Sequence, residues 1–424
     1  MTSSSAAAPV KLWNKNFVLW WLGSAQSAFG TALAGIATSF LVLHQTGSAS
    51  AMGLNLALAM LPALLQPFLG AWVDRIPLKI PLVAGNVLRG LLQLGVGFWA
   101  LRGHLPTEII YAASFLTGLV GAFYAPATQG LVARLVPAGE LERVTGLMQG
   151  ATQTMTMLGL VAGGFLVATL GRAQTLMLDG LSFLLFAGVL LLVQLPARAS
   201  HAADERYWDT FKAGVRYVRG STLLMGLPLL SLLVNASFAP IDMLLPKRML
   251  SLGAGERGYG LFFGLLLAGA AGGSFLVAGL GQRVNARAAS VAGMTVMGLA
   301  VLALAFTQTA VQMYVLAVCM GLGNAFCNMG IGVIFQKRVA PEYFGRVGSL
   351  LGMVGMAGMP LTLLALTPFA DRLSINSIFA VCGIVTVLGA LAWAGILRRD
   401  AKTGEVIRIP IESGRFRFNP SGCE

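Results

Sequence analysis

The sequence predicts an all-α polytopic membrane protein with twelve transmembrane helices in two pseudo-symmetric six-helix bundles. The first observation is composition, because 56% of the 424 residues are hydrophobic, 11% are charged, and the mean hydropathy is +0.78. A water-soluble globule of this length could not bury so much apolar surface, whereas a bilayer can cover it. The second observation is an alternation of long apolar runs with short polar breaks, and the third is a repeat relating the two halves of the chain.

The apolar runs are long enough to cross a bilayer, because a helix of about 20 residues spans the hydrocarbon core. The region between Lys15 and Asp74, for example, contains no Asp, Glu, Lys or Arg and holds two spans. We expect spans at residues 16–43, 49–73, 80–101, 107–133, 143–170, 174–194, 221–246, 257–281, 288–308, 311–336, 346–370 and 375–397.

An internal repeat supports two similar halves. Aligned at an offset of 203 residues, the segment GLVGAF at 118–123 matches GLGNAF at 321–326. Parallel repeats of this kind are typical of transporters built from two bundles. The predicted organisation is an N-terminal tail at 1–15, a first bundle at 16–196, a linker with an amphipathic helix at 197–220, a second bundle at 221–397 and a C-terminal tail at 398–424.

The basic residues collect on one side of the predicted membrane. If both termini are cytoplasmic, 22 of the 29 Lys and Arg residues fall in cytoplasmic segments and six fall in external loops. This bias predicts a multi-pass protein of the cell membrane with both ends in the cytoplasm. The net charge of +13 is spread over the loops and forms no continuous stripe, which argues against a nucleic-acid partner. We expect a monomer in contact with the lipid bilayer.

A charged hairpin separates the second and third predicted spans. It places Asp74 and Arg75 four and five residues after Gly70, followed by Lys79, and it resembles the loop between helices 2 and 3 of major facilitator superfamily transporters. The resemblance implies the fold of that superfamily, in which the Asp of this loop docks at the start of helix 11, here around Arg346. We therefore hypothesise that these five residues form a conformational latch when the cytoplasmic side is closed.

Further stretches resemble the drug:proton antiporter-3 group of the superfamily, and most closely its macrolide efflux proteins. The resemblance covers residues 12–397 and implies an exporter. The stretches include AFYAP at 122–126, LVPAGEL at 135–141, LDGLSF at 178–183, FKAGVRYVR at 211–219, APIDMLLP at 239–246, PEYFGRVGSL at 341–350 and FADRL at 369–373. The fifth span keeps the glycines of the drug-antiporter motif at 159–164 but lacks its Pro, and the fourth span lacks the Arg common in proton-coupled members.

Three charged residues lie well inside predicted spans, where an ionised group is costly unless it faces a cavity or a partner. Arg89 could bind an anionic group or neighbour a proton site, or it could bond to helix-end carbonyls. Asp242 could release a proton outward and bind a cationic drug, or it could pair with Lys247 or Arg248. For Asp179 the alternatives are a helix-capping or packing role and a role in transport.

Polar side chains toward the middle of spans could line a central path as a set, although each alone could form a bond between helices. They are Gln26, Gln93, Gln153, Asn235, Asn324 and Asn328.

The leading functional interpretation is a secondary active exporter of small amphipathic compounds that works by alternating access, coupled to protons as an antiporter. No phosphate-binding loop GxxxxGK[ST] is present, so an ion gradient would supply the energy. A carrier of lysophospholipids or siderophores on the same fold is the alternative. The three His residues fall in loops, away from any catalytic arrangement within a span, so we expect neither an enzyme nor a cofactor or metal.

Overall fold

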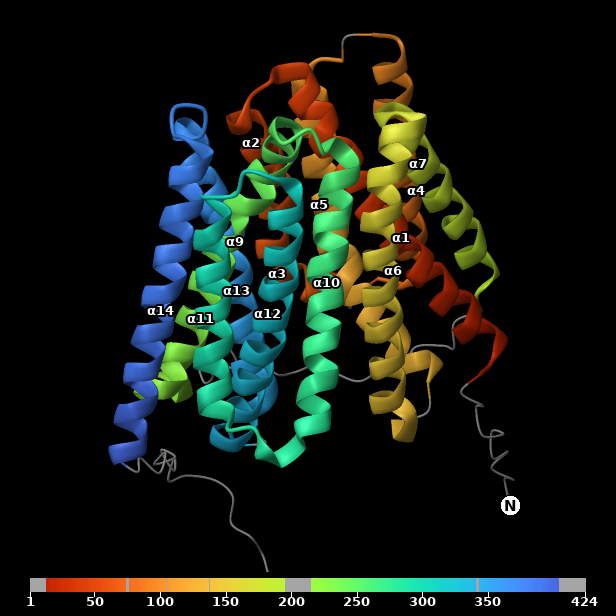
Figure 1. The fold of residues 1–424 in the computed structure, drawn as a ribbon. Coiled ribbons are helices and arrows are strands. Elements are labelled where there is room, and N and C mark those ends of the chain that lie inside the picture. Colours follow the sequence, from red (N-terminus) through yellow and green to blue (C-terminus); the bar gives the residue numbers. More distant parts are fainter. Residues whose placement is uncertain are drawn as a thin grey trace, which may run out of the picture.

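The computed structural model describes residues 13–73, 76–103, 105–136, 138–194, 215–340 and 343–403. Long helices run side by side between two ends of the molecule (Figure 1). The first half contains α1 (Lys15–Thr46), α2 (Ala49–Met60), α3 (Gln66–Val73), α4 (Lys79–Leu101), α5 (Thr107–Leu135), α6 (Leu141–Leu170) and α7 (Arg172–Leu192). The second half contains α9 (Thr222–Ser251), α10 (Gly255–Leu280), α11 (Ala286–Leu304), α12 (Ala310–Arg338), α13 (Phe344–Leu366) and α14 (Ile375–Thr403).

Eleven helices within the described residues are long and apolar enough to cross a membrane. The remaining predicted span, at 49–73, is composite: α2 is followed by the 3-10 helix η1 (Leu61–Leu65) and then by α3. Pro62 lies in the first turn of η1, where its missing amide donor and fixed φ are tolerated, and it interrupts the α-helical hydrogen bonding. The predicted all-α fold with two six-span bundles is confirmed, and its second span is broken.

Some helices begin at a side-chain cap that the local sequence supplies. Asn14 accepts a hydrogen bond from the amide of Phe17 at the start of α1, at 2.9 Å. Thr309 and Gln312 form a reciprocal capping box at the start of α12. These caps satisfy amide donors that the first helical turn leaves unpaired, so α1 and α12 each begin at a defined residue.

Buried side chains form three clusters, and their distribution shows how the halves meet. One cluster draws on both halves and includes Phe40 of α1, Met52 of α2, Met243 of α9 and Phe262 of α10. It lies toward the end that carries the α1–α2 and α13–α14 turns, which we call the joined end (top of Figure 1).

At the opposite end, the halves have separate cores. One is built from the first half around Trp20 and Leu82, and the other from the second half around Leu227 and Trp393. We call this end, with its two separate cores, the split end. The helix α1 begins there and α14 ends there (Figure 1). The molecule is therefore closed at the joined end and open at the split end.

Close packing of α6 on α10 is one of the contacts that close the joined end. A Cβ atom built at Gly164 of α6 would lie 2.6 Å from the carbonyl oxygen of Glu256 and 3.1 Å from Cα of Gly260, both on α10. Only glycine permits this approach, as in other helix pairs that meet through small residues. The same helix has Gly150 nearer the split end, where a Cβ would meet nothing within 4 Å.

We predict that Gly164→Val disfavours this conformation, because the added side chain has to displace the α10 backbone at a cost of about 1–3 kcal/mol. Double electron–electron resonance can measure the distance between spin labels at the exposed positions Arg102 and Phe306, one in each half at the joined end. This distance should be longer in the Gly164→Val variant than in the protein with Gly164. Gly150→Val is the matched control and should leave the distance unchanged. An unaltered distance in the Gly164 variant would contradict the role of this contact.

Candidate functional site

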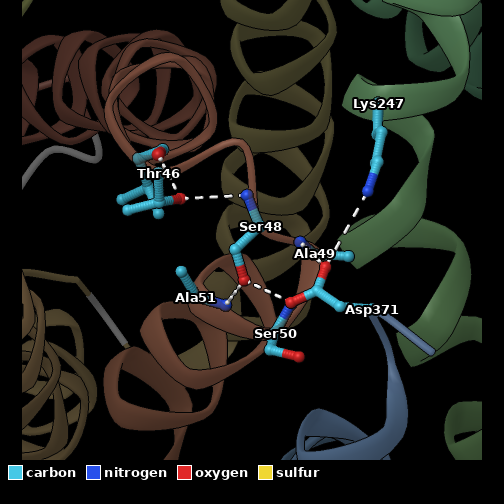
Figure 2. Close-up of polar contacts among 8 residues, drawn as sticks. Thr46, Ser48, Ala49, Ser50, Ala51, Lys247 and Asp371 are labelled. Atoms are coloured by element: carbon cyan, nitrogen blue, oxygen red, sulfur yellow. Dashed lines mark hydrogen bonds and ion pairs between the residues drawn. The ribbon is translucent and has the colours of Figure 1, made fainter.

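A carboxylate from the second half caps a helix of the first half at the joined end. Asp371, in the turn before α14, accepts hydrogen bonds from the backbone amide of Ala49 at 2.7 Å and from that of Ser50 at 3.3 Å (Figure 2). The Ser48 hydroxyl also donates to this carboxylate, and Lys247 Nζ lies 3.8 Å from it. An anion at a helix N-terminus is stabilised by the unpaired amides and by the helix dipole. The contact therefore ties α2 to the second half.

The environment of Asp371 keeps it ionised. Partial burial raises the pKa of its carboxyl group, but hydrogen bonds from Ser48, Ser50 and Ala49 outweigh that effect, so the net pKa lies below its ordinary value of 3.8. The stability that the ionised Asp371 gives to this contact is therefore fully present above pH 3.8, and it is lost as the pH falls through the lowered pKa.

A second polar contact joins the halves nearby. Glu256, at the start of α10, lies 3.4 Å from Nη1 of Arg172 in α7 and 3.4 Å from Nε2 of His44 in α1. The sequence placed Arg172 only as a loop residue, and nothing in it indicated a partner 84 residues away.

A cavity of about 360 Å³ lies inside the first half, between α1, α2, α4, α5 and α7. It contains two of the predicted charged residues, Arg89 from α4 and Asp179 from α7, together with the predicted path residue Gln93. Asn55 and Ser114 add polar groups to its wall and are joined by a hydrogen bond of 2.7 Å. Such a cavity, apolar with a few convergent polar groups, is typical of small-molecule sites.

Arg89 is enclosed by aromatic rings. Its guanidinium carbon lies 5.3 Å from the ring centroid of Tyr124 and 5.7 Å from that of Phe183. Gly121 in the cavity wall leaves room for the Arg89 guanidinium. A Cβ atom at this position would lie 2.7 Å from Nη2 of Arg89, which is closer than van der Waals contact allows. These contacts are cation–π contacts within the cavity, and the described structure records no bond from Arg89 to helix-end carbonyls.

Asp179 is 2% exposed and lies in the interior of α7, whose N-cap residue is Gly171. Asp179 therefore does not cap this helix. Ser182 donates a hydrogen bond to its Oδ1 at 3.4 Å, and a Cβ at Gly30 of α1 would collide with that oxygen.

Several buried polar atoms around this pair have no hydrogen-bond partner among the described residues. They are Nε of Arg89, Oδ2 of Asp179, Oδ1 of Asn86, the hydroxyl of Tyr124 and Oγ1 of Thr128. Unpaired polar groups in an apolar interior are costly, and they concentrate where a ligand or proton is handled. The region around Arg89 and Asp179 is therefore the strongest candidate for a binding site in the first half.

Asp242 lies in α9, where the halves meet. It is within electrostatic range of Tyr259 in α10, and the Tyr259 ring packs edge-on against Phe40 of α1 at 5.6 Å. The alternative pairing partners have other contacts, since Lys247 approaches Asp371 and Arg248 donates to the carbonyl of Thr307. The structure thus places Asp242 next to the surface on which the halves separate.

The other predicted path residues fall into two groups. Gln26, Asn235 and Asn324 are half-buried, and Asn235 donates to the carbonyl of Ser231 in its own helix at 2.8 Å. Gln153 of α6 and Asn328 of α12 are exposed in the middle of their helices, with the Asn328 amide held by Asn324 Oδ1 at 2.9 Å.

Polar side chains within spans are uncommon at lipid-facing positions, so Gln153 and Asn328 stay predicted residues of a central path.

The hypothesised latch is only partly described. Asp74 and Arg75 lie outside the described residues, and Gly70 is in α3. Lys79 donates to the carbonyls of Leu191 and Val193 at 2.7 and 3.2 Å, which closes the end of α7. The guanidinium carbon of Arg346 lies 5.6 Å from the ring centroid of Tyr343.

The geometry defines a class: a polytopic membrane transporter with two helical bundles, rather than an enzyme. The sequence profile of the major facilitator superfamily matches residues 20–248 and 229–412, and the chain belongs to that superfamily. Macrolide efflux protein A of Streptococcus pyogenes is 24% identical over 392 residues, which cover 89% of this chain and 95% of the relative. Multidrug efflux pump Tap of Mycobacterium tuberculosis is 25% identical over 384 residues, covering 86% and 89%.

Solved structures show the same fold at low identity. A bacterial homologue of the human lysosomal transporter Spinster, in an inward-facing and unoccupied conformation, superimposes with a TM-score of 0.70, 13% identity, and coverage of 94% of this chain and 98% of that chain. The nucleoside transporter NupG gives a TM-score of 0.72 at 11% identity, with coverage of 91% and 100%. The predicted fold and the resemblance to macrolide efflux proteins are confirmed.

We predict that Asp371→Ala weakens closure at the joined end by about five- to tenfold, because the α2 amides lose a charged acceptor. The spin-label distance between positions 102 and 306 should lengthen. Between pH 5 and pH 8 the wild-type contact should not respond to titration of Asp371, since the carboxyl pKa lies below 3.8. The control is Arg372→Ala, which removes the neighbouring exposed charge. Equal behaviour of the two variants would contradict the assignment.

Proposed function

We propose that the protein is a secondary active exporter of small amphipathic compounds, and that the split end faces the cytoplasm. The observation that carries the proposal is a set of intramembrane charges, Arg89 and Asp179 in the first half and Asp242 in α9, within two bundles that share a core at one end and have separate cores at the other. The named relatives are macrolide and multidrug efflux proteins. The excess of basic residues in the segments at the split end supports the orientation, with both termini in the cytoplasm.

In this proposal the two halves, at 16–196 and 221–397, rock against each other as rigid units joined by the linker at 197–220. The described conformation is the one that admits substrate from the cytoplasm. Closing the split end would bring Asp74 and Arg75 to the start of α13 near Arg346, where the latch would form. Separation at the joined end would break the contacts of Asp371 and Glu256.

Asp242 is proposed as the group that carries the proton. It is within electrostatic range of Tyr259 on α10, whose ring packs against Phe40 of α1, so opening of the joined end would admit water near it. A carboxyl group changes its proton affinity when its surroundings change from buried to wet, and this difference can couple proton uptake to rocking. The protein would then exchange protons for substrate as an antiporter. We propose that a single chain performs this exchange.

Arg89 and Asp179 are proposed to anchor the substrate in the first-half cavity. Their unpaired atoms supply a donor and an acceptor, and the Tyr124 and Phe183 rings supply apolar faces. This combination suits an amphipathic compound that carries both a polar group and an apolar body.

The proton assignment predicts that Asp242→Asn abolishes substrate-triggered proton movement in proteoliposomes, because an amide neither takes up nor releases a proton. Glu108→Gln removes an exposed carboxylate at the start of α5 and should retain the signal. Macrolides and lipophilic cations are the probes. Full proton movement in the Asp242 variant would refute its role, and a lysophospholipid or siderophore carrier would give no signal with any drug.

For the cavity pair, we predict that Arg89→Gln and Asp179→Asn each reduce substrate transport at least about tenfold, and that each lowers thermal stability by leaving a buried charge uncompensated. The double variant should recover stability, since neither charge remains. Transport should stay low in the double variant if these groups bind substrate. Recovery of both properties would show that the pair is only structural. Arg102→Gln, at the exposed end of α4, is the control.

A further inference from the structure

A second large cavity lies at the split end of the second half, outside the path described above. It has a volume of about 1070 Å³ and lies between the α10–α11 turn, the start of α11 and the end of α12. Four basic side chains line it: Arg283, Arg287, Lys337 and Arg338.

The carboxylate described in this cluster is engaged by two of these groups. Asp400 of α14 is 7% exposed, and its Oδ2 lies 2.8 Å from Arg287 Nη2 and also accepts from Arg338. Arg283 and Lys337 are exposed at the cavity wall. The cluster therefore carries a marked excess of positive charge, which favours an anionic ligand.

The repeat relates this excess to the first half of the sequence. Near the offset of the repeat, at a separation of 208 residues instead of 203, the hairpin at 282–283 corresponds to the charged hairpin at 74–75, and Gln282 stands where the first copy has Asp74. The basic residue is kept, as Arg283, while the acidic residue is absent. The second hairpin consequently lacks the group that would neutralise it.

The helix whose first residues line the cavity also carries a surface that suits lipid chains. The exposed residues of α11 recur every three or four positions and are apolar, at Ala288, Ala292, Val296 and Leu299. This face points away from the bundle core, as expected of a helix in contact with acyl chains. The face begins at Ala288, one residue after Arg287, so basic groups and apolar residues are adjacent in sequence at the start of α11.

We propose that this cavity binds the phosphate group of an anionic phospholipid in the leaflet at the split end. Arg283 and Lys337 contact the phosphate, Arg287 and Arg338 are held in position by Asp400, and the acyl chains lie along the exposed face of α11. Bound lipid would steady the base of the second half without entering the transport path.

The test is lipid-dependent thermal unfolding of the full-length protein in a neutral detergent. Phosphatidylglycerol should raise the unfolding temperature of wild type more than phosphatidylcholine does. In the double variant Arg283→Gln/Lys337→Gln the apparent affinity for phosphatidylglycerol should fall roughly 30-fold. Each basic residue near a membrane surface contributes about 1 kcal/mol of attraction to anionic headgroups, and the variant loses two such residues. The control Arg219→Gln/Arg398→Gln removes two exposed charges at the same end, outside the cavity, and should behave as wild type.

A measurement with inorganic phosphate distinguishes a phospholipid headgroup from a soluble phosphate ion as the ligand. If phosphate alone reproduces the full stabilisation, the ligand is a soluble anion and the lipid assignment is overturned. Undiminished phosphatidylglycerol binding by the cavity variant would also overturn it. If that variant is unstable in detergent, native mass spectrometry of the lipid retained after extraction gives the same comparison, with loss of the lipid expected only in the cavity variant.

Discussion

The confinement of inter-half packing to one end is the constraint on which the rest of the structure depends. The shared core around Phe40, Met52 and Met243 is apolar and tightly packed, whereas the cores at the other end belong to separate bundles. Polar contacts from Asp371 and Glu256 ring this shared core and are open to water at its edge. Packed interfaces of this kind are bistable, so the proposed rocking would take the bundles between two defined arrangements rather than through a continuum.

The glycines of α13 also pack unequally along the helix, here within the second half. A Cβ at Gly358 would meet the backbone of α9, 3.1 Å from the amide nitrogen of Ala236, whereas Gly352, nearer the split end, has nothing within 4 Å. A helix with small residues on both sides of its midpoint can pack closely at either end. The unused glycine surface near the split end is consistent with a second arrangement in which that end is closed.

Much of the fold followed from the sequence because hydropathy and charge are local signals. The spans, their order and their apolar character are set by runs that a bilayer selects, and Arg89, Asp179 and Asp242 stood out because charges are rare inside such runs. The sequence shows Pro62, but it does not show that the helix changes to a 3-10 segment there, because a membrane helix can also bend and continue through Pro.

What the sequence could not indicate is which distant side chains share a site. That Arg89 and Asp179 line one cavity depends on the packing of α4 against α7, and the union of Asp371 with Ser48 joins residues 323 positions apart. Both results are properties of three-dimensional packing. The FADRL stretch marked the position of Asp371 by resemblance without revealing its partner.

The interruption of the second span has a mechanical consequence. Its upper segment, α2, is fastened through its first turn to the opposite half, while Val73 at the end of its lower segment, α3, belongs to the core of its own half. A continuous helix would transmit any tilt of one segment rigidly to the other. With η1 between them, a tilt of α2 during the proposed rocking would be taken up by a few backbone torsions near Leu61, and the lower segment would keep its position while the upper one reorients.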